Sequence, residues 1–257
     1  MVRARKELGQ NFLFDDKVLA TIAGYGELSS SDSVLEIGPG LGTLTRQLCA
    51  RAGRVTAVEF DSDLAANLQD LASENSKLAV INEDILRFDL DSLPRDYKVV
   101  ANIPYNITSK IIERLWASDN QPQLAVLLVQ KEVAERLAAR AGQLSVIAIA
   151  TQVFATIELG IKVPAELFTP APKVDSQVVI MKRRPQPLVP ADKLDQFMYV
   201  VKAGFSEKRK KLRSSLAVGL RTNKVEAERL LAEVGIDPNK RAQELTIDEW
   251  KRLAKVD

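Results

Sequence analysis

The chain has 257 residues, 46% of them hydrophobic and 27% charged, which is typical of a folded globular protein with one large domain and room for a small one. A single cysteine and no histidine exclude an internal disulfide, a cysteine-cluster metal site and a histidine base. No apolar run approaches the roughly 18 residues of a membrane span, and the N-terminus lacks a signal-peptide core. We therefore expect a cytoplasmic protein with no metal and no membrane partner.

The net charge of +2 hides an uneven distribution. Residues 1–181 carry 18 Lys and Arg against 23 Asp and Glu, a net −5, whereas residues 182–257 carry 18 against 11, a net +7. A basic C-terminal part indicates a nucleic-acid partner, although such charge also occurs on ordinary solvated surfaces.

The N-terminus is basic and then abruptly apolar. Arg5 and Lys6 fit either a frayed tail, which the charge alone favours, or an arm that contacts RNA phosphates. Asp15 has the side chain of a helix N-cap, and apolar residues at helical spacing predict a helix from there to about Gly24.

Residues 34–42 are the most informative stretch. An apolar run ends in three alternate glycines, Gly38, Gly40 and Gly42, and the helical pattern of Thr43–Arg51 follows. This order of strand, tight turn and helix start describes a nucleotide-binding turn, because glycine accepts positive φ and a helix N-terminus offers free N–H groups.

Two acids narrow the choice of ligand. The glycines follow G-x-G-x-G rather than the G-x-G-x-x-G of dinucleotide sites, and Glu36 stands just before them. A carboxylate there disfavours a pyrophosphate and favours a cationic ligand such as S-adenosylmethionine. Glu59 ends the next predicted strand, Arg54–Glu59, where an acid can take ribose hydroxyls. A structural turn and a nicotinamide dinucleotide site are the alternatives.

The following segments alternate in type, with a helix from Asp61 to about Glu74 and a strand over Leu78–Asn82. This predicts an α/β fold with a Rossmann-like, doubly wound, mostly parallel sheet, whose ligands bind at the carboxyl ends of the strands. Asp84 follows such an end, where a carboxylate beside the apolar Ile85 can take an adenine amino group. A turn cap fits its position equally well.

A second informative stretch, Asn102–Tyr105, follows a strand predicted over Tyr97–Ala101. The Asn102 amide oxygen and the Pro104 carbonyl can both accept hydrogen bonds from one exocyclic amino group, and Tyr105 can stack on its ring. A turn with an exposed tyrosine is the alternative.

The alternation continues, but two features stay open. Residues 144–153 are ambiguous, because Ser145 suggests a helix cap whereas the β-branched residues suggest a strand. Phe168, between a strand and two prolines, is either a core plug or a second stacking wall. The other expected elements are helices 107–116 and 131–140 and strands 124–129, 154–163 and 175–181.

Three prolines in Arg183–Pro190 predict a boundary between a domain of residues 1–184 and a small all-helical domain of residues 185–257. We expect helices at 191–203, 206–219 and 224–234, and a last helix whose capping box is Thr246 with Glu249. Basic residues begin the second of these helices, where RNA phosphates would compensate their charge near the positive helix end. They are Lys208, Arg209, Lys210, Lys211 and Arg213.

Seven segments of the chain form a recognisable combination. They are Leu8–Leu13, Leu35–Gly42, Asn102–Asn106, Gln130–Ala134, Phe168–Ser176, Lys208–Leu216 and Arg241–Leu245. Together they closely resemble the rRNA adenine N6,N6-dimethyltransferases, which dimethylate two adjacent adenines in a hairpin near the 3′ end of small-subunit rRNA. The likeness covers nearly the whole chain and implies a class I methyltransferase fold, a small RNA-binding domain and a helix at 144–153.

The resemblance also implies S-adenosylmethionine as cofactor, with S-adenosylhomocysteine as product. Gln10, Asn11 and Leu13 would close over the cofactor, Gly38 and Gly40 would contact its methionine part, Glu59 its ribose, and Asp84 and Ile85 its adenine, with Asn102 alongside. Related erythromycin-resistance methyltransferases, which act on one adenine of large-subunit rRNA, are an alternative. The segments Phe168–Ser176 and Lys208–Leu216 favour the small-subunit class.

The chemistry needs no strong base. An adenine amino group is a poor nucleophile until acceptors such as Asn102 and Pro104 draw it out of the ring plane, in line with the sulfonium methyl. The base would leave its RNA stack and rest on Tyr105 and Phe168. The expected partner of this monomer is small-subunit rRNA in the immature small subunit. An assembly factor whose binding outweighs its catalysis is a further alternative.

Overall fold

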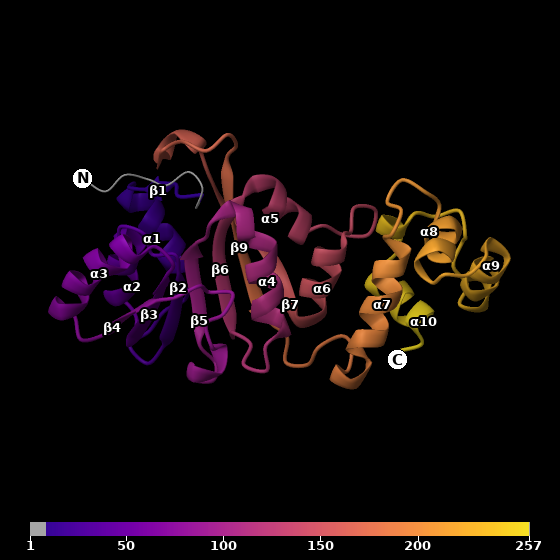
Figure 1. Cartoon of the computed structure of the whole chain (residues 1–257), viewed down its shortest axis with the longest axis horizontal. Helices are drawn as coiled ribbons and strands as arrows, with labels where there is room; N and C mark the ends of the chain where they lie inside the picture. The colour runs from indigo at the N-terminus through magenta and orange to yellow at the C-terminus, as the bar shows by residue number, and fades with distance from the viewer. Residues whose placement is uncertain (1–8, 257) are drawn as a thin grey trace. The chain divides into compact units, whose positions relative to one another are not determined.

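The computed structural model describes residues 9–256 (Figure 1). The chain divides into two compact units, each with its own core. The first, called here the sheet unit, extends to Glu135 and includes Thr156–Arg183; the second, called the helical unit, contains Arg136–Ala155 and the residues from Arg184 on.

The observed division differs from the expected one in a single segment. We expected residues 136–155 in the first domain, but they group with the helical unit. The reason is their apolar side chains, because Ala148, Ile149 and Val153 are fully buried in the same core as Phe197 and Leu216. A boundary read from prolines could not reveal this, since no proline precedes residue 136 closely.

The sheet unit is built on seven strands in the order β4-β3-β2-β5-β6-β9-β7. The first five are parallel, and β9 is antiparallel to β6. The predicted doubly wound, mostly parallel sheet is thereby confirmed. The strands are β2 (Ser33–Ile37), β3 (Arg54–Glu59), β4 (Leu78–Asn82), β5 (Lys98–Asn102), β6 (Leu124–Gln130), β7 (Ala155–Val163) and β9 (Ser176–Arg183), with a separate antiparallel pair of β1 (Phe12–Leu13) and β8 (Phe168–Thr169).

α-Helices precede, connect or follow the parallel strands (Figure 1). The predicted N-caps are confirmed, because the Asp15 carboxylate accepts from the Val18 amide and Asp61 accepts from the Asp63 amide. These helices are α1 (Asp16–Tyr25), α2 (Thr43–Cys49), α3 (Ser62–Glu74), α4 (Thr108–Ala117) and α5 (Lys131–Leu137).

Alternate residues of the central strands face opposite sides of the sheet. Val34 of β2 packs in a core with Leu19 of α1 and Leu48 of α2, whereas its neighbour Leu35 is equally buried outside that core. Burial on both faces is the arrangement that places a binding crevice at the carboxyl ends of the parallel strands.

The helical unit contains five α-helices among the residues that the structure describes. Residues 146–154 form a helix, capped by the Ser145 hydroxyl, which decides the ambiguity between helix and strand. The capping box of Thr246 and Glu249 is also confirmed. The helices are α6 (Val146–Phe154), α7 (Leu194–Gly204), α8 (Leu212–Gly219), α9 (Lys224–Glu233) and α10 (Ile247–Ala254).

The helix predicted over residues 206–219 is too long, because α8 begins at Leu212. The Leu212 amide donates to the Lys240 carbonyl (2.7 Å) and the Arg213 amide to the Pro238 carbonyl (3.3 Å), so a distant segment supplies the acceptors at this helix start. The basic run of residues 208–211 therefore precedes the helix instead of opening it. No helix in residues 9–256 is long and apolar enough to cross a membrane.

Candidate active site

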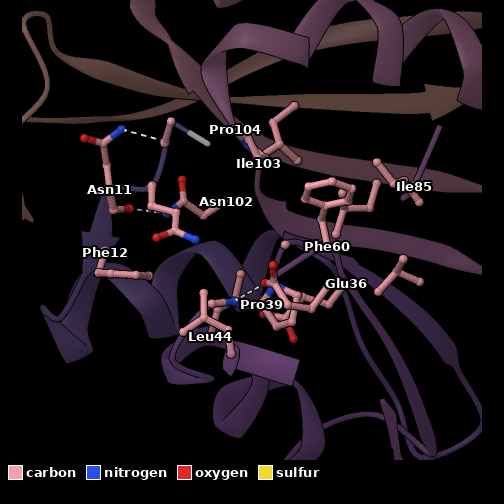
Figure 2. Close-up of a pocket in the computed structure, with 18 of the residues that line it drawn as sticks. Asn11, Phe12, Glu36, Pro39, Leu44, Phe60, Ile85, Asn102, Ile103 and Pro104 are labelled. Carbon is pink, nitrogen blue, oxygen red and sulfur yellow. Dashed lines mark hydrogen bonds between the residues drawn. The ribbon is translucent and has the colours of Figure 1, made fainter. Parts of the chain in front are cut away.

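A pocket lies at the carboxyl ends of β2, β3, β4 and β5, within the sheet unit (Figure 2). Its floor is the glycine turn, where Gly38 and Gly40 have φ values of 63° and 59°. A Cβ on Gly40 would lie 3.1 Å from the Phe12 ring, and one on Gly38 would lie 3.5 Å from Pro104. Both positions therefore have a conformation that favours glycine, and at Gly40 the Phe12 ring also leaves little room for a side chain.

Glu59, at the end of β3, is hydrogen-bonded to the glycine turn. One carboxylate oxygen accepts from the Gly40 amide (3.0 Å) and the other from the Asp61 amide (2.9 Å). Glu59 is 6% exposed, and burial raises the pKa of its carboxyl group. The acid that the sequence placed at a ribose site thus lines the pocket in a fixed orientation.

Glu36 lies deeper, with 1% of its surface exposed. Its Oε2 has no hydrogen-bond partner among residues 9–256, although it lines the pocket. Burial, aided by the charge of Glu59, raises the pKa of Glu36 to about 8. An unpartnered buried carboxyl group is costly unless a ligand completes its contacts.

Residues 9–13, called here the N-terminal strap, run along the pocket and join its two sides. The Thr43 hydroxyl donates to the Leu13 carbonyl (3.0 Å) on the glycine side. On the opposite side, Asn102 Nδ2 donates to the Asn11 carbonyl (3.2 Å), as Figure 2 shows. Gln10 Nε2 donates to the Asp61 carboxylate (3.0 Å). All of these residues except Asp61 line the pocket.

Asp84 and Ile85 follow β4 and also line the pocket. Asp84 Oδ1 accepts from the Leu86 amide (2.9 Å), so the turn cap that we considered is present in addition to the pocket position. Sequence reasoning missed Phe60, which is 62% exposed at the pocket wall beside Glu59. Its place directly after the acid that ends β3 could have signalled it.

The corner after β5 presents acceptors in a different way from the one predicted. The Pro104 carbonyl already accepts from the Ile107 amide (3.4 Å) and the Thr108 hydroxyl (3.2 Å), because it begins the short helical turn Tyr105–Ile107. Within residues 9–256, the Ile103 carbonyl accepts no hydrogen bond. The carbonyl left for a ligand at this corner is thus that of Ile103.

The two predicted stacking aromatics are separated by the structure. Tyr105 lines the pocket, half-buried. Phe168 does not: it is 3% exposed in the core, and its strand β8 pairs with β1 so that Phe168 lies opposite Leu13. The core-plug alternative fits this position, because a side chain that supports the strap cannot also face the pocket.

The expected RNA-binding residues differ in availability. Arg5 and Lys6 lie outside the described residues. Arg213 pairs with Glu228 (2.7 Å), and Lys211 donates to the Asn239 amide oxygen (2.9 Å). The other three, Lys208, Arg209 and Lys210, are exposed and form no ion pair within residues 9–256.

Comparison with known proteins gives the family. The profile of the family described as "Ribosomal RNA adenine dimethylase" matches residues 1–256. The chain belongs to the ribosomal RNA adenine dimethylase family. It is an rRNA adenine methyltransferase of the dimethylating kind, as predicted.

The similar proteins agree with this membership. The chain is 38% identical to "Ribosomal RNA small subunit methyltransferase A" of Bacillus mycoides, over 98% of this chain and 90% of the relative. It resembles the crystal structure of a dimethyladenosine transferase from Plasmodium falciparum (TM-score 0.81, 26% identity, 94% of this chain and 95% of that one). It also resembles the crystal structure of the 23S rRNA methyltransferase ErmE (TM-score 0.76, 32% identity, 95% and 98%). The predicted class I methyltransferase fold is confirmed.

Proposed function

We propose that this enzyme transfers methyl groups from S-adenosylmethionine to N6 of two adjacent adenines in the 3′-terminal hairpin of small-subunit rRNA. The single observation that supports this most is the pocket, which joins two buried acids and a glycine turn to an amide acceptor, Asn102, on one sheet edge. The relatives that the chain matches over nearly its full length are named as small-subunit rRNA methyltransferases.

The residues on the glycine side fit the cofactor. The open Oε2 of Glu36 can take a cationic group, whose charge would favour the ionised form of this acid, and the backbone at Gly38 and Gly40 has no side chain to keep a ligand away. Glu59 would accept from ribose hydroxyls, and Asp84 with Ile85 would hold the adenine ring. When bound, the cofactor supplies an electrophilic methyl group.

The residues on the other side would hold the target base. Because Asn102 Nδ2 donates to the Asn11 carbonyl, its Oδ1 is left to accept from the adenine amino group, together with the Ile103 carbonyl. Two acceptors on one amino group favour the pyramidal nitrogen that attacks carbon. Tyr105 would offer its ring to the base, and the leaving proton would pass to water, since no histidine is present.

The helical unit would hold the RNA. Lys208, Arg209 and Lys210 are free to contact phosphates, which position an RNA without reading its sequence. The basic N-terminal residues would add a second phosphate contact. We place the monomeric enzyme in the cytoplasm, acting on the immature small subunit.

The experiment is a methyl-transfer assay with labelled S-adenosylmethionine on purified small and large subunits that lack these modifications, followed by mapping of the modified nucleosides. We expect N6,N6-dimethyladenosine at two adjacent small-subunit positions. Incorporation into the large subunit alone would contradict the proposal and favour the activity named for the structural neighbour ErmE.

A second comparison separates catalysis from binding. A cell that carries an inactive Asn102→Ala enzyme should lack dimethyladenosine. If small-subunit assembly still proceeds in that cell but fails when the cations of residues 208–210 are removed, binding is the main role of the protein.

A further inference from the structure

Tyr105 lines the pocket, but its hydroxyl bonds to Ser176, which does not. The hydroxyl shares a short hydrogen bond with Ser176 Oγ, and Ser176 is fully buried as the first residue of β9. Neither hydroxyl forms another hydrogen bond within residues 9–256. Burial also raises the pKa of Tyr105, so the group stays neutral. What Tyr105 offers to the pocket is therefore its ring.

Ser176 is a fixed anchor for this hydroxyl. It pairs with Gln130 in the antiparallel ladder between β9 and β6. The preceding residue, Asp175, accepts from the Lys131 amide through its carbonyl (3.0 Å) and from the Ala165 amide through its carboxylate (3.0 Å). An acceptor or donor held on so many sides constrains whatever it binds.

The other end of Tyr105 is fixed as well. Its backbone follows Pro104, whose φ is −59°, and begins the helical turn Tyr105–Ile107. The ring is thus attached to β5 through its backbone and to β9 through its hydroxyl. Two attachments remove the freedom of the ring to rotate about its side-chain bonds.

We infer that Ser176 is a positioning residue, which fixes the plane of the Tyr105 ring beside Asn102 so that the target adenine stacks in line for methyl transfer. This inference rests on the proposed function. The role that this inference gives to the Tyr105 hydroxyl is to hold the ring through Ser176. A small displacement of the reacting groups lowers the rate of methyl transfer strongly.

The test compares Ser176→Ala, Tyr105→Phe and the double variant in methyl transfer to small subunits. Each single variant removes one end of the same hydrogen bond, so each should lower kcat about tenfold. The double variant should lose no more than either single variant. Affinity for S-adenosylhomocysteine should stay within about twofold of the wild type, because the anchor does not touch the glycine side.

Two controls decide the interpretation. Tyr105→Ala removes the ring and should lose far more activity than Tyr105→Phe. Ser118→Ala removes the hydrogen bond that the Asn120 backbone amide donates to the Ser118 hydroxyl, outside this pocket. This variant should leave kcat unchanged.

Three results would overturn the inference: single variants with wild-type kcat, a double variant with the product of both losses, or a loss of kcat that follows a loss of cofactor affinity. Each presupposes an active wild-type chain. A wild-type chain that methylates neither subunit contradicts the proposed function instead.

Discussion

The pocket of the sheet unit and the basic segment of the helical unit, residues 208–211, use polar side chains in opposite ways. In the pocket, Glu59 is 6% exposed and both of its oxygens accept backbone amides, and Asn102 is oriented by the Asn11 carbonyl. In the basic segment, the side chains are exposed and none of the four forms an ion pair within residues 9–256, although Lys211 donates to the Asn239 amide oxygen.

The functions that we propose for the two regions account for this difference. Methyl transfer requires two groups within a few tenths of an ångström of one geometry, which only groups held in advance can provide. A phosphate backbone is bound through charge, which tolerates many side-chain conformations. Substitutions in the pocket should therefore affect the rate, whereas substitutions in the basic segment should affect affinity and its dependence on salt.

The largest effect should come from Asn102→Ala. Without the amide oxygen, one of two acceptors for the adenine amino group is lost, and we expect kcat to fall by about 1,000-fold or more. RNA affinity and its salt dependence should not change. Single-turnover methyl transfer and filter binding measure the two quantities, and Asn75→Ala, at the end of α3 outside the pocket, is the matched control.

The next largest effect should come from Gly40→Ala, which places a methyl group 3.1 Å from the Phe12 ring at a φ of 59°. Cofactor affinity should fall by about 100-fold, because the added carbon occupies the ligand side of the turn. Gly235→Ala is a close control, since Gly235 has a φ of 68° and open space around it.

Both glycine variants should lose about 1–2 kcal/mol of unfolding free energy, from the positive φ alone. Only Gly40→Ala should also lose affinity in calorimetric titration with S-adenosylhomocysteine. Equal affinities in the two variants would show that the turn does not contact the cofactor.

The combined Lys208→Ala, Arg209→Ala and Lys210→Ala variant should bind small-subunit RNA about 10- to 100-fold more weakly at low salt. The slope of log affinity against log salt should become shallower by about 2, because three phosphate contacts are lost. The same number of exposed cations can be removed from the sheet unit, at Lys17, Lys110 and Lys162, as a control. If that control loses as much affinity, total charge and not its position determines binding.

Glu36→Gln tests the buried acid through stability rather than through rate or affinity. The pKa of Glu36 is raised to about 8 in the folded protein, above its usual 4.5, so the folded state holds a proton that the unfolded state releases. The free energy of unfolding of the wild type therefore falls as the pH rises from about 4.5 to about 8. A glutamine at this position does not ionise, so the variant has no such dependence.

We expect Glu36→Gln to unfold at a free energy about 3 kcal/mol higher than the wild type at pH 7, with the difference vanishing near pH 4. Urea unfolding at several pH values measures this. Glu74→Gln, at the exposed end of α3, should show no such trend. A constant difference across this pH range would mean that Glu36 is ionised in the folded protein.

The sequence by itself determined the order of the elements and the acids and glycines on one side of the pocket. Strands β3 and β4 begin and end where predicted, and Asp15 and Asp61 cap their helices, because these signals lie within a few neighbouring residues. Glu36 and Glu59 could be assigned to one site because parallel strands bring their carboxyl ends to the same edge.

The tertiary structure alone decided the features that depend on distant segments. It buried Phe168 opposite Leu13, gave residues 136–155 to the helical unit, and started α8 at Leu212 with acceptors from residues 238 and 240. It also engaged the Pro104 carbonyl in a turn and left that of Ile103 open. In each case a group had its hydrogen bond or its apolar contact supplied by a part of the chain that no local pattern can identify.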